Sequence, residues 1–111
     1  MELNQAVKSL AALAQESRLA VYKMLVQAGP AGMAAGRISE QLGISASALS
    51  FHMKELTHAS LVTSRQEGRY VIYSAQIASM NDLLTYLTEN CCGGNPCSPV
   101  SVACQPKAEP V

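Results

Sequence analysis

The sequence predicts a mainly helical fold with a small β element, which is the α+β class. The chain has 111 residues, of which 49% are apolar and 5% aromatic, and this is enough for one small domain. Apolar residues recur at helical spacing over most of the first 58 positions and again after position 76. Between these regions, two runs rich in β-branched and aromatic residues surround a glycine, a pattern typical of a β-hairpin.

The first two helices are predicted from apolar spacing and from the residues that bound them. The first covers about residues 2–13, and its large apolar side chains share one face: Leu3, Val7 and Leu10. Ser17 is a residue type preferred at the N-cap, so we expect it to start the second helix. Gly29 and Pro30 end that helix, because proline cannot continue its hydrogen bonding.

A short helix and a longer one follow, separated by a tight turn. The short helix has Ile38 and Leu42 on its inner face and ends at Gly43, which suits the left-handed conformation of a C-terminal cap. The turn covers residues 43–47. The longer helix then carries its large apolar side chains on one face: Leu49, Met53 and Leu56.

After residue 60 the apolar period changes from that of a helix to that of a strand. Residues 61–65 and 69–73 are predicted strands, joined by a turn at 66–68. A last helix covers about residues 76–89, with its apolar residues on one face: Ile77, Met80, Leu84 and Leu87. Four of the five prolines and all four cysteines follow. We therefore expect a folded domain over residues 1–89 and a tail over residues 90–111.

Helix, tight turn, helix and hairpin is the order of a winged helix-turn-helix. In such a domain the second helix of the pair enters the major groove of double-stranded DNA. The predicted DNA contacts are Ser45, Ser47, Ser50, His52 and Lys54 on the helix and Arg65 and Arg69 on the hairpin. Each residue type also has an ordinary role that stays open, since serines cap helices, histidines pack structurally, and lysines and arginines lie in solvent.

The charge balance limits how such a domain could bind DNA. Eight Lys and Arg residues balance eight Asp and Glu residues, so the formal net charge is zero. DNA binding must therefore depend on a few well-placed cations, and a winged helix that binds protein instead stays open. No catalytic constellation indicates an enzyme or a catalytic cofactor. We also expect a cytoplasmic protein with no membrane partner, because neither a signal peptide nor a membrane-spanning run is visible.

The first and last helices have apolar faces that lack a partner inside one small domain. A second copy of the chain would cover them and give a two-fold symmetric homodimer. Two recognition helices would then meet successive major grooves about 34 Å apart. The residues expected at this dimer interface are Leu3, Val7, Leu10, Ile77, Met80, Leu84 and Leu87. The alternative is that both helices complete the core of a monomer.

The cysteines form a candidate site for a soft metal or metalloid. Cys91, Cys92 and Cys97 lie within seven residues, and Cys104 follows. Adjacent cysteines cannot form the Cys-x-x-Cys arrangement of a zinc knuckle or a thioredoxin-like site. Three thiolates suit a trigonal centre such as As(III) or Sb(III), whereas tetrahedral zinc would need a fourth ligand. A redox pair or incidental cysteines in a tail are the alternatives.

Several segments together resemble the ArsR/SmtB family of metal-responsive repressors. They are Glu16–Leu19, Ser50–Leu56, Ala59–Val62 and Glu67–Tyr70 with Tyr73. The resemblance covers about residues 3–89 and is specific as a set. It implies a homodimeric winged-helix protein that represses its own resistance operon and leaves DNA when metal binds.

Within that family, the position of the ligands determines which metal is sensed. One arsenic-sensing pattern has Cys-x-Cys before the recognition helix, but residues 34–38 contain no thiol, and Asp82 lacks the neighbouring histidine of the zinc pattern. The chain is instead similar to arsenite sensors whose cysteine pair closes the last helix. This similarity implies As(III) bound by Cys91, Cys92 and Cys97, with Cys104 able to replace Cys97. Sb(III), methylarsenite, Cd, Pb or Zn as effector, and a thiol-redox switch, are the alternatives.

Overall fold

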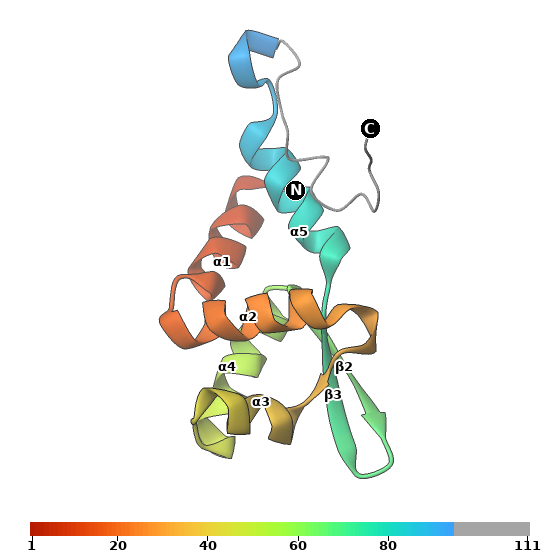
Figure 1. Ribbon diagram of the computed structural model, residues 1–111. Helices are drawn as coiled ribbons and strands as arrows, with labels where there is room; N and C mark the ends of the chain where they lie inside the picture. The colour runs from red at the N-terminus through yellow and green to blue at the C-terminus, as the bar shows by residue number, and fades with distance from the viewer. Residues whose placement is uncertain (95–111) are drawn as a thin grey trace.

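The structure is a computed structural model that describes residues 1–94 (Figure 1). Its α-helices are α1 (Leu3–Leu13), α2 (Glu16–Ala28), α3 (Ala35–Leu42), α4 (Ala46–His58) and α5 (Ile77–Thr88). Its strands are β1 (Met33–Ala34), β2 (Val62–Glu67) and β3 (Tyr70–Ala75), and short 3-10 helices cover Gly29–Ala31 and Cys91–Gly94. This order confirms the predicted mainly helical α+β fold, a winged helix-turn-helix with a further helix at each end.

Helix α2 crosses the middle of the molecule and separates two groups of elements (Figure 1). Helices α3 and α4 pack against each other on one side, and the β2–β3 hairpin projects from that side. Helix α1 lies on the other side of α2, where it also contacts α5, and α5 leads away from the hairpin. The hairpin and the far end of α5 therefore lie at opposite ends of the molecule, whereas α1 also contacts α4.

The small sheet contains one strand that the sequence did not reveal. Strand β3 is central and antiparallel to both β1 and β2. A two-residue strand is too short to show a period, so the sequence predicts no strand between Pro30 and the short helix that follows. Gly32 precedes β1 with a φ of 71°, and a Cβ there would collide with the carbonyl oxygen of Tyr73. Glycine at this position therefore allows β1 to approach β3.

The hairpin has longer strands and a shorter turn than predicted. Glu67 pairs with Tyr70, so only Gly68 and Arg69 connect the strands. Gly68 has a φ of 64° and Arg69 does not have a positive φ, and a positive φ at the first turn position alone is the mark of a type II′ turn. Arg69 therefore lies at the tip of the wing rather than at the start of a strand.

The core forms where α2, α3, α4 and the start of β2 meet. Its largest fully buried side chains come from all of these elements: Val21, Leu25, Ile38, Met53, Leu56, Leu61 and Val62. Burying one such side chain stabilises the fold by about 1.5–3 kcal/mol relative to leaving it in water. The predicted inner face of α4 is confirmed, since Leu49, Met53 and Leu56 are all buried.

Local side-chain caps fix where α2 and α4 begin. The prediction that Ser17 caps α2 is wrong, because the helix already begins at Glu16 and the side chain of Gln15 accepts from the backbone N–H of Arg18 at 2.9 Å. Ser45 caps α4, where its Oγ accepts from the backbone N–H of Ala48 at 3.1 Å. Gly43 adopts the expected left-handed conformation at the end of α3, with a φ of 67°.

Candidate nucleic-acid interface and effector segment

Helix α4 presents a polar outer face opposite its buried side. Ser47, Ser50 and Lys54 are exposed at helical spacing, as predicted for a recognition helix. Ser45 precedes them and is also exposed, but its hydroxyl oxygen is engaged in the cap. The small side chains at the start of the helix allow the backbone to approach a base edge closely.

His52 is half-buried and is held by a residue from another helix. The guanidinium of Arg18 donates from Nε to the carbonyl oxygen of Ala12 at 2.6 Å, and its Nη1 lies 3.4 Å from Nδ1 of His52. Because a guanidinium only donates, a hydrogen bond between these two groups uses Nδ1 as the acceptor. Arg18 therefore ties the last turn of α1 to the recognition helix.

The contacts of Arg18 could not be predicted from the sequence pattern. The residue stood within a family signature, Glu16–Leu19, but its partners are six and 34 positions away along the chain. Contacts of that separation leave no periodic pattern, so the sequence offered only the signature itself as a signal.

The two arginines of the wing have different surroundings. Arg65 donates from Nε to Glu67 at 2.6 Å and from Nη2 to the carbonyl oxygen of Ala31 at 2.8 Å. Its Nη1 also donates to the carbonyl oxygen of Pro30 at 3.5 Å and to Oγ of Ser74 at 3.4 Å, so the guanidinium joins the wing to the segment before β1 and one of its five N–H donors is left. Arg69 is exposed at the turn beside the exposed Tyr70. Of the two, Arg69 is the better placed to reach a DNA phosphate.

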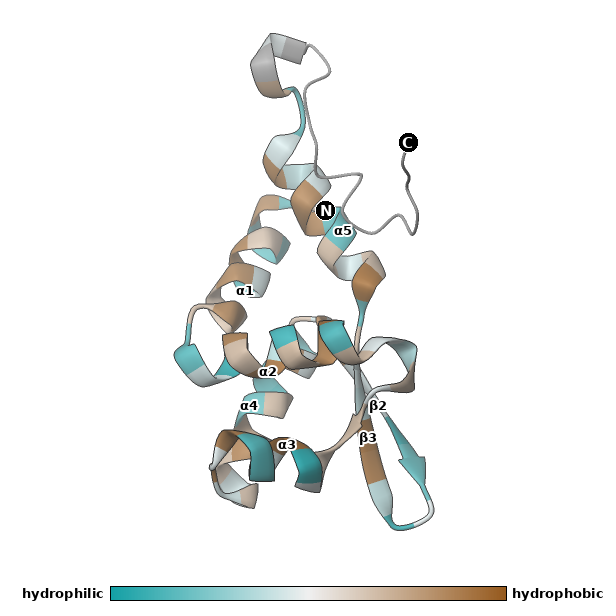
Figure 2. Cartoon of the chain, in the orientation of Figure 1, coloured by the Kyte–Doolittle hydropathy of each residue, from teal (hydrophilic) through white to brown (hydrophobic). Residues whose placement is uncertain are grey.

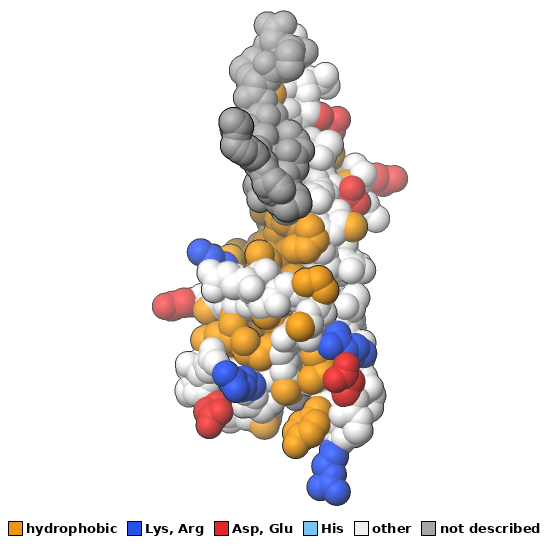
Figure 3. All heavy atoms as spheres, turned by 45° about the vertical axis from the view of Figure 1, so that its right-hand side comes forward, with side chains coloured by type: hydrophobic (Ala, Val, Ile, Leu, Met, Phe, Trp, Pro, Cys, Tyr) orange, Lys and Arg blue, Asp and Glu red, His pale blue; other side chains and the backbone are white. Residues whose placement is uncertain are grey.

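On the face shown in Figure 3, the charged side chains are dispersed rather than gathered in a basic stripe. The Lys and Arg side chains on this face stand apart from one another, and apolar side chains fill much of the surface between them. This agrees with the zero net charge of the chain. Any phosphate contacts must therefore come from individual cations.

Helix α1 has its large apolar side chains outside and its small ones inside. Ala6 is 2% exposed and Val7 is 56% exposed, and the same contrast holds as far as Leu10, whereas Leu13 packs against the core. The inner face comprises Ala6, Ser9 and Ala12, and the outer face comprises Leu3, Val7 and Leu10. Figure 2 shows apolar residues along α1.

Helix α5 is divided between packed and exposed apolar residues. Leu83 is buried, although its spacing had not placed it on the predicted apolar face. Met80 packs partly on the core and Leu84 is half-buried, whereas Ile77 and Leu87 are exposed. The predicted interface residues of both terminal helices therefore include five that solvent reaches: Leu3, Val7, Leu10, Ile77 and Leu87.

The cysteine pair does not close α5, which corrects one expectation. The helix ends at Thr88, Asn90 has a φ of 59°, and Cys91 begins a separate 3-10 turn that includes Cys92. The Cys91 side chain is half-buried. Cys97 and Cys104 lie outside the described residues. Within residues 1–94, no group of three His, Cys, Asp or Glu side chains could hold a metal ion, so a trithiolate needs a cysteine from beyond residue 94.

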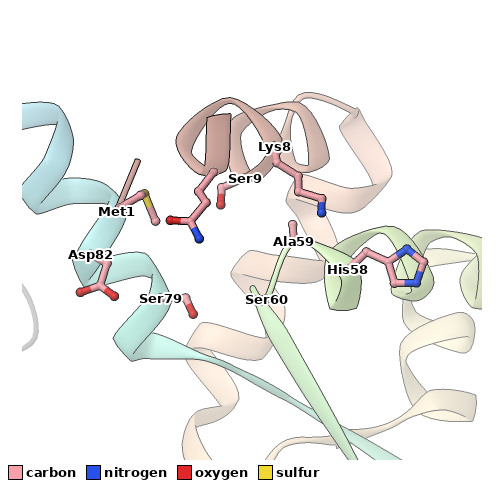
Figure 4. A pocket seen from close by; sticks show the side chains of 9 residues that line it. Met1, Lys8, Ser9, His58, Ala59, Ser60, Ser79 and Asp82 are labelled. Atoms are coloured by element: carbon pink, nitrogen blue, oxygen red, sulfur yellow. The ribbon is translucent and has the colours of Figure 1, made fainter. Parts of the chain in front are cut away.

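A polar pocket of about 320 Å³ lies between α1, the end of α4 and α5 (Figure 4). His58 and Asp82 both line it, which the sequence did not indicate, since they are far apart along the chain. In Figure 4 they lie at opposite ends, with Lys8 beside His58 and Ser79 beside Asp82. The pocket therefore does not recreate the paired Asp and His ligands of a zinc site.

These features define a winged-helix DNA-binding protein, and comparisons with known proteins agree. A family profile described as a helix-turn-helix domain matches residues 13–65. The transcriptional activator HlyU of Vibrio cholerae is 37% identical over 89 residues, covering 76% of this chain and 80% of that protein. The transcriptional regulator YgaV of Escherichia coli is 30% identical over 88 residues, covering 79% and 87%.

Comparison with solved structures indicates the same class of protein. An ArsR-like transcriptional regulator from Rhodococcus sp. RHA1 superposes with a TM-score of 0.69 at 28% identity, over 78% of each chain. HlyU from Vibrio cholerae N16961 superposes with a TM-score of 0.62 at 36% identity, over 78% of this chain and 97% of that one. The chain belongs to the ArsR/SmtB family of winged-helix, DNA-binding transcriptional regulators. No helix within residues 1–94 has the length and apolarity needed to cross a membrane.

Proposed function

We propose that this chain is a homodimeric repressor that binds operator DNA and leaves it when As(III) binds the thiols of Cys91, Cys92 and Cys97. The observation that carries this proposal is the position of Cys91. Only Glu89 and Asn90 separate it from α5, whose exposed apolar residues need a partner. An effector at the thiols would therefore act directly on the end of a helix that holds two protomers together.

Helix α1 exposes larger apolar residues and buries small ones, and this arrangement supports the homodimer. A helix that only completed a monomer core would have its large side chains inside, because burial of apolar area is what stabilises packing. Instead Val7 and Leu10 face solvent while alanines pack inward. A second copy would bury these residues together with Ile77 and Leu87, and two-fold symmetry would follow.

The distance between the two α4 helices then determines operator affinity. Two recognition helices must meet successive major grooves, so a shift of the interface changes the fit of the whole dimer. Arg18 contributes to this coupling, because it joins the end of α1 to His52 on α4. Allosteric couplings are typically about 1–3 kcal/mol, which corresponds to a roughly 5- to 150-fold loss of operator affinity.

The donor set suits a soft metalloid. Thiolates select soft centres, and three of them without a fourth ligand match the trigonal preference of As(III). When bound, As(III) would hold three cysteine sulfurs together. Cys91 and Cys92 are one turn past α5, and Cys97 or Cys104 would fold back onto them. Because the segment between Cys92 and Cys97 is short, bringing its ends together costs little conformational entropy.

The test is operator release measured by fluorescence anisotropy. The full-length, reduced protein is bound to the promoter fragment of its own operon and titrated with arsenite. We expect the anisotropy to fall as As(III) binds, and we expect a Cys91→Ser, Cys92→Ser variant to bind the fragment equally well but to stay bound. Parallel titrations with Sb(III), methylarsenite, Cd, Pb, Zn and peroxide separate the alternative effectors and a redox switch.

Two results would contradict the proposal. Normal release of the double cysteine variant by arsenite would show that the thiol site is elsewhere. A wild-type protein that sediments as a monomer while it binds the promoter would remove the proposed route from the effector to DNA. Single Cys97→Ser and Cys104→Ser variants identify the third ligand.

A further inference from the structure

Phe51 is the only phenylalanine of the chain, and it lies on the outer face of the recognition helix. It is 55% exposed and takes no part in the core cluster, to which α4 contributes Leu49, Met53 and Leu56. A single exposed apolar residue is ordinary on most protein surfaces. On a helix that enters the major groove, however, this ring would be covered by DNA.

The surroundings of Phe51 favour a close approach to DNA. Its neighbours on the helix surface are Ser47 and Lys54, which are exposed, and Ala48 and Glu55, which are half-buried. The ring packs edge-on against His52, with the two ring centroids 5.7 Å apart and an interplanar angle of 62°. His52 is itself contacted by Arg18, so the phenyl ring rests on a side chain that is held in place.

The chemistry of a phenyl ring limits what it can recognise in the groove. Most of the major-groove edge of each base pair consists of hydrogen-bond donors and acceptors, and a phenyl ring can pair with none of them. The exception is the C5-methyl group of thymine, which is apolar and projects into the major groove. Contact between the ring and this methyl group would remove apolar area of both from water.

We propose that Phe51 is a specificity-determining residue that contacts the C5-methyl group of a thymine in each operator half-site. The proposal rests on the DNA-binding role of α4 and adds a base preference to it. Polar and cationic side chains position the helix on the sugar-phosphate backbone, which carries no sequence information. Phe51 supplies a contact that distinguishes one base from another.

The test removes the methyl group and the ring independently. Duplexes are first selected from a random DNA library by the full-length, reduced protein, and each thymine is then replaced singly by deoxyuridine, which lacks only the methyl group. We expect one position in each half-site at which this replacement weakens wild-type binding about four-fold, the effect of losing one buried methyl contact. The Phe51→Ala variant is expected to bind the thymine and deoxyuridine duplexes equally.

Leu19→Ala is the matched control, because Leu19 is 46% exposed but lies on α2. This variant should keep the four-fold difference between thymine and deoxyuridine. The proposal is overturned if Phe51→Ala also keeps that difference, or if no thymine replacement affects the wild-type protein. A wild-type protein that selects no duplex at all would contradict DNA binding itself, so the two failures can be told apart.

Discussion

Helices α1 and α4 are both amphipathic, but they turn opposite kinds of side chain towards the core. In α4 the large residues Leu49, Met53 and Leu56 are buried and mostly small or polar residues face solvent. In α1 the buried residues are Ala6, Ser9 and Ala12, and larger apolar residues face solvent. The arrangement in α4 is that of a helix packed on a hydrophobic core, and the arrangement in α1 is that of a surface that a partner covers. The two helices can therefore be tested by matched substitutions with different readouts.

The largest effect is expected from the core side of α4. Leu56→Ala should lower the free energy of unfolding by about 2–5 kcal/mol, because it removes buried methyl groups and leaves a cavity. Urea denaturation followed by circular dichroism measures this change. Thr57→Ala, at the exposed neighbouring position, should change the unfolding free energy by no more than about 0.5 kcal/mol. Equal effects at the two positions would contradict the assignment of the buried face.

The outer face of α1 should control assembly rather than folding of the protomer. A Val7→Glu, Leu10→Glu variant is expected to be monomeric in sedimentation. It should bind operator DNA at least about 100-fold more weakly, because a monomer contacts one half-site and loses the linkage to the second. Its helical circular dichroism spectrum should be preserved. A Leu19→Glu, Val26→Glu variant places the same two charges on exposed apolar residues of α2 and should remain dimeric. If both variants stayed dimeric, α1 would not form the interface.

Arg18 connects α1 with α4, and its removal should have an effect of intermediate size on the free energy of unfolding. Arg18→Ala removes donors to the Ala12 carbonyl oxygen and to His52, and should cost about 1.5–3 kcal/mol of unfolding free energy. His52→Asn offers an acceptor near the position of Nδ1 and should retain part of the contact, whereas His52→Leu should not. A double-mutant cycle on unfolding free energy measures the coupling. Additive effects of Arg18→Ala and His52→Leu would show that the two side chains do not interact.

The smallest effect is expected at the start of α4. Ser45→Ala removes the cap on the backbone N–H of Ala48 and should lower the unfolding free energy by about 1 kcal/mol. Ser45→Asp should restore the cap but place a negative charge near DNA. If capping is the sole role of Ser45, operator affinity of the alanine variant should stay within about two-fold of the wild type, allowing for a small change in stability. A larger loss, measured by anisotropy, would indicate an additional DNA contact.

Much of the fold was predictable because its signals are local. The end of α3 follows from Gly43, which adopts a left-handed conformation, and the start of α4 follows to within two residues from Ser45 and Ser47, both of a type preferred at the N-cap. The hairpin follows from the change to a strand period and from Gly68 at the turn. Where the local signal was weak, the prediction failed, as with the two-residue strand β1 and with Gln15 in place of Ser17 as the cap.

The sequence by itself determined the order of the five helices and the hairpin, the inner face of α4 and the concentration of thiols after α5. Apolar period, capping residues and cysteine spacing are properties of neighbouring positions, so they can be read without the fold. Only the tertiary structure decided that α1 turns its large side chains outward, that Arg18 meets His52 and that Arg65 is bound to the Ala31 carbonyl oxygen. Those features depend on which distant segments meet in space, and long-range contacts and hydrogen bonds leave no trace in local spacing.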